Sequence, residues 1–183
     1  MPHCARQRRR CARLWRVTER FRSERLDADS HDLSTFTCGE GSLDRWLQEQ
    51  AVEATKRGTA RTWVWTDDRG AVVAYYALAA HKVVREEVPR NVGRGGPSEI
   101  PAVLLARLAL AQKLRGQGLG PLLVADALQR VVDASQIVGA RLVAVDAIAE
   151  RVAQLYETLG FRRIPGSLLL IQKISDVEAS IGP

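Results

Sequence analysis

A glycine-rich turn at residues 115–120, Arg-Gly-Gln-Gly-Leu-Gly, is the segment best suited to ligand chemistry. It lies between a nearly continuous apolar run, residues 101–111, and a segment with helical periodicity that has Pro121 at its start. Glycines let a backbone turn tightly and approach a ligand closely. The N–H groups of such a turn and of the following helix attract an anion. The turn therefore predicts a pyrophosphate site, and the alternative is a tight turn without a ligand.

The glycine spacing excludes two common nucleotide-binding motifs. A dinucleotide-binding turn requires G-x-G-x-x-G and a later acidic ribose contact, whereas this turn reads G-x-G-x-G. A Walker A loop requires a Gly-Lys-Ser/Thr run, which the chain lacks. Cys4, Cys11 and Cys38 do not have the paired spacing of zinc ligands, and the chain has only three histidines, so no metal site is predicted.

Strands and helices are expected to alternate around this turn. Strands are predicted at residues 59–66, 71–80, 101–111, 141–147, 161–164 and 168–174, with a further short strand within 24–41. Helices are predicted after the N-cap Ser42 and ending before Gly58, from Pro121 onward, and at residues 150–159 before Gly160. Residues 86–101 are expected to form a loop, and the run at 101–111 is expected to be buried on both faces. This order predicts an α/β (α+β) fold with a mixed sheet.

Composition favours one compact domain in a reducing compartment. The chain has 183 residues, 46% of them hydrophobic, which is enough to bury a core. No run approaches the roughly 18 apolar residues of a membrane span. The few, scattered cysteines do not form a disulfide framework, so the cytoplasm is the expected location.

The positive charge is concentrated at the N-terminus. Residues 1–25 hold nine arginines and two acidic residues, a net charge of +7, whereas residues 26–183 hold 18 basic and 19 acidic residues, a net charge of −1. We therefore predict an Arg-rich, disordered leader over 1–25 and a single domain over 26–183. The leader lacks the apolar region of a secretory signal. A start at an alternative codon such as that of Val17 would leave residues 1–16 outside the protein.

The glycine turn resembles the acyl-coenzyme A signature of the GNAT superfamily of N-acetyltransferases, Arg/Gln-x-x-Gly-x-Gly/Ala, filled here by Arg115, Gly118 and Gly120. The resemblance covers about residues 30–174. It implies a sheet that splays open between the strands at 102–111 and 141–147, with acetyl-CoA in the opening. The implied cofactor-binding residues are Leu108, Ala109 and Leu110 beside the pantetheine, and Arg115, Gly116, Gln117, Gly118, Leu119 and Gly120 around the pyrophosphate.

Five further blocks resemble the GNAT toxins of bacterial toxin–antitoxin modules. They are Phe36-x-Cys38-Gly39, Leu43-Asp44-x-Trp46-Leu47, Tyr75-Tyr76-Ala77-Leu78, Leu105-Ala106-Arg107-Leu108-Ala109 and Tyr156-x-x-x-Gly160-Phe161. This resemblance implies a translation-blocking enzyme that acetylates the α-amine of aminoacyl-tRNA. It also implies a ribbon-helix-helix antitoxin as partner and a homodimer. The chain departs from the pattern at Ala111, Asp146 and Leu155.

Tyr156 is the candidate catalytic residue. Its position shares one helical face with Val152, Leu155 and Leu159, which is equally typical of a core tyrosine. The resemblance favours catalysis, because a tyrosine hydroxyl near the sulfur can protonate the thiolate that leaves when an amine attacks a thioester.

Four basic residues are candidates for substrate phosphates: Lys82, Arg85, Arg90 and Arg94. Glu86 and Glu87 lie among them, and a solvated surface is the usual explanation of such a run. The net charge of −1 over residues 26–183 also counts against a nucleic-acid surface.

Weaker hypotheses concern single residues elsewhere. Tyr75 and Tyr76 must face opposite sides of a strand, one toward the core and one toward an acceptor groove. Arg107 interrupts an apolar strand and is expected to form a structural ion pair. Asp146 ends a strand and can help to deprotonate the amine, and Cys38 is expected to be structural.

Three functions remain open from the sequence. The first is acetylation of aminoacyl-tRNA by a toxin. The second is acetylation of another amine, such as a small molecule or a protein N-terminus. The third is a binding module that keeps the fold without catalysis.

Overall fold

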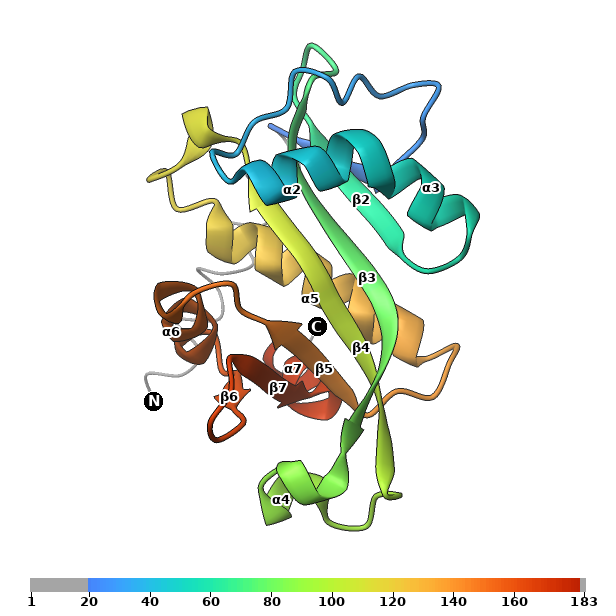
Figure 1. The fold of residues 1–183 in the computed structure, drawn as a ribbon, viewed down its shortest axis with the longest axis vertical. Coiled ribbons are helices and arrows are strands. Elements are labelled where there is room, and N and C mark those ends of the chain that lie inside the picture. The colour runs from blue at the N-terminus through green and yellow to red at the C-terminus, as the bar shows by residue number, and fades with distance from the viewer. Residues whose placement is uncertain (1–19, 182–183) are drawn as a thin grey trace. The chain divides into compact units, whose positions relative to one another are not determined.

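The computed structural model describes residues 20–181 as a series of strands and helices (Figure 1). The strands are β1 (Arg22–Arg25), β2 (Arg61–Thr66), β3 (Val72–Val84), β4 (Glu99–Leu110), β5 (Leu142–Asp146), β6 (Arg162–Arg163) and β7 (Leu169–Lys173). The helices are α2 (Gly41–Arg45), α3 (Ala51–Lys56), α4 (Arg90–Gly93), α5 (Gly120–Ser135), α6 (Glu150–Thr158) and α7 (Ile174–Ile181). The shorter helical segments are the π-helical η1 (Trp46–Gln50) and the 3-10 turns η2 (Arg85–Glu87) and η3 (Gln112–Leu114).

The strands form one mixed sheet in the order β1-β2-β3-β4-β5-β7-β6. Strands β4 and β5 are parallel, in register from Ala102 opposite Leu142 to Leu105 opposite Val145. The pairs β1–β2, β5–β7 and β6–β7 are antiparallel. This arrangement confirms the predicted α/β class with a mixed central sheet.

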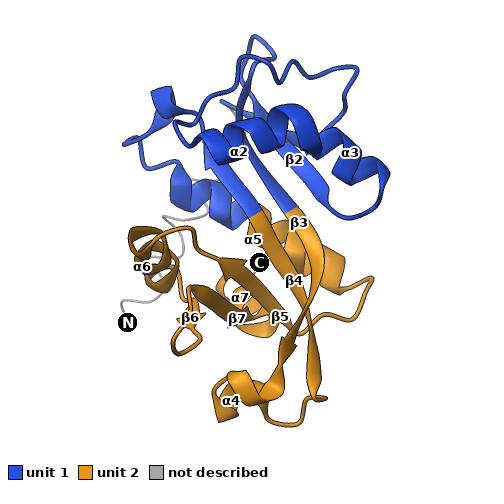
Figure 2. Cartoon of the chain, viewed as in Figure 1, with its two compact units in different colours: residues 1–77, 107–126 blue, residues 78–106, 127–183 orange. Residues whose placement is uncertain are grey.

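The chain divides into two compact units (Figure 2). Unit 1 contains the described residues up to Ala77 together with Arg107–Asp126. Unit 2 contains Leu78–Ala106 and the described residues from Ala127 onward. The glycine turn therefore belongs to unit 1, and Tyr156 belongs to unit 2.

The core of unit 1 is built around the buried first half of β3. Tyr75 and Tyr76 are both fully buried and point to opposite faces of the strand, as alternation requires. Tyr75 stacks on Trp46 at 5.8 Å, and its hydroxyl donates a 2.8 Å hydrogen bond to the carbonyl oxygen of Leu43. Tyr76 stacks on Trp63 at 5.7 Å. Because neither ring is exposed, the prediction that one of them lines an acceptor groove is wrong.

One carboxylate oxygen ties α5 to three strands of unit 1. Asp126 Oδ2 accepts hydrogen bonds from the hydroxyl of Ser23 at 2.6 Å, the indole N–H of Trp65 at 2.7 Å and the hydroxyl of Tyr76 at 3.1 Å. These donors come from β1, β2 and β3. Charge-assisted bonds of this kind are shorter and stronger than neutral ones, so Asp126 fixes the first half of α5 on the sheet.

The helical segment at residues 41–56 starts earlier than predicted. It begins at Gly41 with Glu40 at the N-cap, where no side chain caps the helix, so Ser42 lies inside α2. Residues Trp46–Gln50 then form the π-helical segment η1 before the chain returns to α-helix in α3. Gly58, with φ of +73°, follows the end of α3 as predicted.

The core of unit 2 joins the second half of β3 to β4, β5 and β7. Its buried residues are Val83, Val88, Val92, Ile100, Ala102, Leu142, Ala144, Ile164 and Ile171. Val88 and Val92 place η2 and α4 over this core. The predicted loop at 86–101 is therefore wrong in part, since it contains α4 and the start of β4.

Three other boundaries differ from expectation. Strand β1 occupies residues 22–25, and Phe21 is buried against Trp65 at 5.8 Å, so the predicted leader is wrong at its C-terminal end. The remainder of that leader, residues 1–19, lies outside the described residues. Strand β4 is not buried on both faces, because Arg107 is exposed and its neighbours are half-buried. Helix α7 was not predicted.

Within residues 20–181, no helix is both long enough and apolar enough to cross a membrane.

Candidate active site

The glycine turn forms an open cradle at the start of α5. Gly116 and Gly118 have φ of +76° and +72°, a conformation that only glycine adopts readily. A Cβ added at either glycine, or at Gly120, would meet no atom within 4 Å, so the space around the turn is free for a ligand. Within residues 20–181, the backbone N–H groups of 116–120 donate to no protein acceptor. These groups and the helix N-terminus fit a pyrophosphate.

The side chain of Arg115 braces the turn instead of pointing away from the protein. Its Nη2 donates a hydrogen bond to the carbonyl oxygen of Cys38. The backbone N–H of Gln112 donates to the carbonyl oxygen of Thr37 at 3.0 Å. Gly39, with φ of +79°, has the Gln112 side chain 3.4 Å from where a Cβ would lie. The segment before α2 therefore holds the turn from outside, a contact that the sequence analysis missed.

Cys38 is buried and held in place by this same segment. Its side chain is 2% exposed, and its backbone N–H donates to Asp44 Oδ1 at 2.8 Å. Burial, together with the carboxylate of Asp44, raises the pKa of the Cys38 thiol to about 11. This confirms that Cys38 is structural, since the reactive form of a cysteine is its thiolate.

Cys38 is expected to resist alkylation in the folded protein. At pH 8 its thiolate fraction is roughly a hundredfold below that of an ordinary thiol, and its burial slows access further. Peptide mapping after iodoacetamide treatment measures this. Cys38 should stay unmodified in the native protein and react fully in denaturant, whereas rapid native labelling would contradict the buried position.

Residues Leu108, Ala109 and Leu110 form the end of β4 that leads into the turn. Ala109 is buried, and the two leucines are half-buried. The parallel pairing with β5 ends at Leu105, so the peptide groups of 108–110 lie beyond it. The backbone N–H of Ala111 donates to the carbonyl oxygen of Val73 at 2.8 Å, which fixes this end of the strand in unit 1. The predicted pairing of these residues with pantetheine stays a prediction.

Tyr156 lies on α6 with its ring in the interior. The residue is 4% exposed, and its ring meets that of Phe161 edge-on at 5.3 Å. The backbone N–H of Phe161 donates to the Tyr156 carbonyl oxygen at 3.1 Å, where Gly160 with φ of +100° ends the helix. Burial raises the pKa of the Tyr156 hydroxyl well above its usual value. The group therefore stays protonated at neutral pH, as a proton donor must.

Within residues 20–181, the Tyr156 hydroxyl donates a hydrogen bond to no other residue. Its proton is therefore not engaged by a neighbouring side chain or carbonyl group of this part of the chain.

The four predicted basic residues differ in their surroundings. Lys82 forms a 2.6 Å ion pair with Glu99. Arg85 lies 3.5 Å from the carboxylate of Glu86, and its Nη1 donates to the carbonyl oxygen of Gly96 at 3.1 Å. These contacts reduce the positive charge that Lys82 and Arg85 offer to a ligand.

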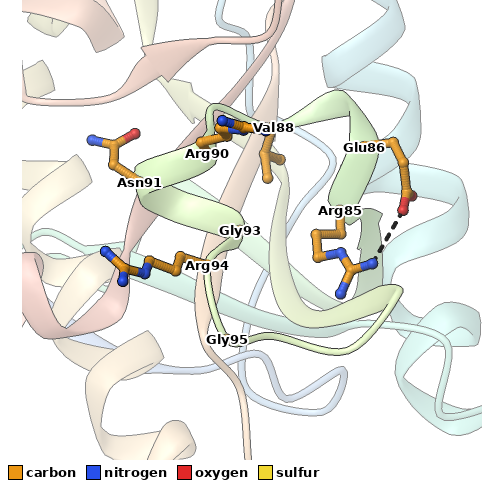
Figure 3. Close-up of a pocket in the computed structure, with 8 residues that line it drawn as sticks. All are labelled: Arg85, Glu86, Val88, Arg90, Asn91, Gly93, Arg94 and Gly95. Atoms are coloured by element: carbon orange, nitrogen blue, oxygen red, sulfur yellow. Dashed lines mark hydrogen bonds and ion pairs between the residues drawn. The ribbon is translucent and has the colours of Figure 1, made fainter.

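Arg90 and Arg94 have no ion-pair partner among the described residues. With Asn91 they line a cavity of about 800 Å³ beside α4, which Arg85 also borders (Figure 3). Figure 3 shows Asn91 and Arg94 extending to the same side of α4, away from the Arg85–Glu86 pair. The structure thus brings two of the four predicted residues together as unpaired cations.

Asp146 ends β5 and Arg107 lies within β4, so both residues are on the strands that the sequence predicted for them. Asp146 is exposed at the end of β5, so its suggested role as a base stays a prediction. The guanidinium of Arg107 lies over the Trp46 ring, 5.6 Å from its centroid. The contact seen for Arg107 is a cation–π contact.

Comparison with known proteins identifies the family to which the chain belongs. The acetyltransferase (GNAT) family profile matches residues 26–161, well over half of the chain. The chain belongs to the GNAT acetyltransferase family. The predicted resemblance is therefore confirmed, and the chain is an acetyltransferase.

Similar GNAT proteins include characterised toxins. A tRNA-acetylating toxin from Mycobacterium tuberculosis is 35% identical over 163 residues, which cover 88% of this chain and 98% of the relative. The solved structure of AtaT complexed with acetyl-methionyl-tRNAfMet is 28% identical with a TM-score of 0.81, covering 88% of this chain and 99% of AtaT. A mutant AtaT toxin bound to the C-terminus of the antitoxin AtaR and acetyl-CoA is 28% identical with a TM-score of 0.76, covering 89% and 99% of the two chains.

Proposed function

We propose that this GNAT enzyme transfers the acetyl group of acetyl-CoA to the α-amine of aminoacyl-tRNA and acts as a translation-blocking toxin. The observation that carries the proposal is the set of unpaired backbone N–H groups at residues 116–120 of unit 1, and the protonated Tyr156 hydroxyl of α6 adds a proton donor. The likeness to a tRNA-acetylating toxin and to AtaT with acetyl-methionyl-tRNAfMet supports this choice of acceptor.

The residues divide the reaction between binding and proton transfer. The N–H groups of 116–120 hold the pyrophosphate, and residues 108–110 offer peptide groups to the pantetheine. Acetyl-CoA, when bound, supplies the thioester carbon that the amine attacks and the sulfur that leaves as a thiolate. The Tyr156 hydroxyl donates its proton to that sulfur, so that CoA leaves as the thiol, and the proton that the acetylated nitrogen loses restores the hydroxyl. The remaining acceleration comes from holding the amine and the thioester in line.

An antitoxin partner and a cytoplasmic location belong to the same proposal. AtaT is bound by the C-terminus of its antitoxin, which supports a similar partner here. A ribbon-helix-helix domain in that partner and a homodimeric state of this chain stay predictions from the toxin resemblance. Because tRNA charging and translation take place in the cytoplasm, the proposed substrate places the enzyme there.

The acceptor can be identified directly. Radiolabelled acetyl groups should pass to charged tRNA and not to uncharged tRNA, because only the charged form carries a free α-amine. Labelling of a polyamine or a protein N-terminus, with charged tRNA unlabelled, would leave the acetyltransferase activity and remove the toxin proposal.

Arg90 and Arg94 are expected to contribute most of the phosphate binding of the basic group. The double variant Arg90→Gln/Arg94→Gln should weaken binding of charged tRNA on the order of tenfold. The variant should also weaken the dependence of binding on salt. The slope of log affinity against log salt concentration should become less steep by roughly one unit for each lost phosphate contact. Filter binding over a salt series measures both quantities.

The matched control is Lys82→Gln/Arg85→Gln, which removes the same charge from residues that already have acceptors. This control should change affinity much less, and so should deletion of residues 1–16. If the two double variants weaken tRNA binding equally, net charge alone determines the affinity and Arg90 and Arg94 have no special role. Loss of tRNA acetylation on deleting the leader would assign the binding to that segment.

A further inference from the structure

Arg163 of β6 contacts carboxylates at both ends of α6. Its Nη2 lies 2.7 Å from Glu150 Oε1 and its Nη1 lies 2.9 Å from Glu150 Oε2, so the first contact is bidentate. Its Nε lies 3.1 Å from Oε1 of Glu157. The side chain of Arg163 is only 27% exposed. Glu150 and Glu157 are seven residues apart, two turns on one face of the helix, and one guanidinium therefore spans α6.

Apart from the packing of Tyr156 on Phe161 and the hydrogen bond at its C-terminal end, helix α6 has few buried contacts to fix its orientation. It is nine residues long, and only Ala153 and Tyr156 are buried. Its N-cap, Ala149, offers no side-chain hydrogen bond. A short helix with so small an apolar contact can shift or rotate unless other contacts hold it. Any such movement displaces the Tyr156 hydroxyl, which is the group that must meet the leaving sulfur.

We propose that Arg163 is a positioning residue for Tyr156. By forming ion pairs with Glu150 and Glu157, it sets the orientation of α6 and therefore the position of the catalytic hydroxyl. This inference rests on the proposed role of Tyr156. Bidentate arginine–carboxylate pairs and ion-pair networks are the surface contacts that hold geometry best. Consistent with a formed pair, hydrogen bonding to Arg163 lowers the pKa of the Glu150 carboxyl.

The contacts of Arg163 differ from those of its neighbour. Arg162 precedes it in the same two-residue strand, is exposed, and makes no ion pair among the described residues. Arg162→Gln therefore removes the same charge from the same strand without touching α6. It is the matched control for Arg163→Gln.

The test combines turnover, cofactor binding and hydrogen exchange in the full chain. Arg163→Gln should lower kcat about tenfold, since a misplacement of a reacting group by about 1 Å can cost about a hundredfold and a smaller displacement costs less. Its Kd for acetyl-CoA should change less than about twofold, because residues 116–120 belong to unit 1. The backbone amides of α6 should exchange faster. Arg162→Gln should leave all three unchanged, and Arg163→Lys should recover part of kcat.

A double variant separates positioning from a general structural effect. If Arg163 acts through the Tyr156 hydroxyl, then adding Arg163→Gln to Tyr156→Phe should lower kcat no further. A further tenfold loss in that background, or an unchanged kcat and unchanged exchange in Arg163→Gln alone, would overturn the inference. If Arg163→Gln does not fold, Glu157→Gln removes one contact from the helix side and should give a smaller effect of the same pattern.

The failure of this inference can be told from the failure of the proposed function. If Tyr156→Phe keeps full turnover, the catalytic role of Tyr156 is wrong, whatever Arg163 does. If Tyr156→Phe is inactive but Arg163→Gln is normal in turnover and exchange, only the positioning role is wrong.

Discussion

Turnover of the Tyr156→Phe variant is expected to fall by roughly 10²–10⁴, the range that general acid catalysis contributes. The substitution keeps the ring and its 5.3 Å edge contact with Phe161 and removes only the hydroxyl. Affinity for acetyl-CoA should barely change, because the hydroxyl is needed only when the thiolate leaves. Steady-state kinetics with charged tRNA and calorimetry with acetyl-CoA measure the two quantities.

Tyr75→Phe provides the matched control for this prediction. Tyr75 is also a buried tyrosine, but its hydroxyl donates to the Leu43 carbonyl oxygen. Removing that bond should lower the free energy of unfolding by about 1 kcal/mol and leave kcat nearly unchanged. Normal turnover in Tyr156→Phe would return Tyr156 to the role of a core residue, which its helical position alone also fits.

Acetyl-CoA affinity of Gly118→Asp is expected to fall by a hundredfold or more. The new carboxylate repels the pyrophosphate and also prevents its contacts with the backbone N–H groups. A loss of a few kcal/mol in binding free energy corresponds to about two orders of magnitude in Kd. The residue also has φ of +72°, which a side chain adopts with strain. Calorimetry on the folded variant measures the affinity.

Two variants separate charge from strain. Gly166→Asp introduces the same side chain at a glycine with φ of +75° and open surroundings, between β6 and β7, and should leave the affinity unchanged. Gly118→Ala brings the strain without the charge and should have an intermediate effect. Unchanged affinity in Gly118→Asp would remove the assignment of the cradle.

Features set by neighbouring residues in the chain could be predicted from the sequence. The turn at 115–120 is recognisable because positive φ at Gly116 and Gly118 is available to glycine and few other residues. The helix that carries Tyr156 is recognisable from its periodicity and from Gly160. These local rules gave the order of the elements and the candidate residues of the site.

Features set by contacts between distant residues could not be predicted. The hydrogen bond from Arg115 to the Cys38 carbonyl oxygen joins residues 77 positions apart, and the ion pair of Arg163 with Glu150 joins residues 13 positions apart. Nothing in the composition shows that Glu99 pairs with Lys82, or that Arg90 and Arg94 have no ion-pair partner in the part of the chain that the structure describes. Helix α4 was missed because four residues with Gly and Pro around them carry no periodicity, and Val92 is held there by its burial.

The π-helical segment η1 has a consequence for chain length in this family. A π turn holds one residue more than an α turn and commonly lies within an otherwise α-helical stretch. Losing one residue from Trp46–Gln50 would let α2 and α3 join as a regular helix, without a new loop. Because the extra residue is accommodated within one wider turn, the residues on either side of the deletion would keep nearly their present orientation, and Asp44 would keep its contacts with Cys38 and Thr37. Homologous chains are therefore expected to tolerate the loss of one residue here, and a gap in this segment should not require a different residue at the position of Asp44.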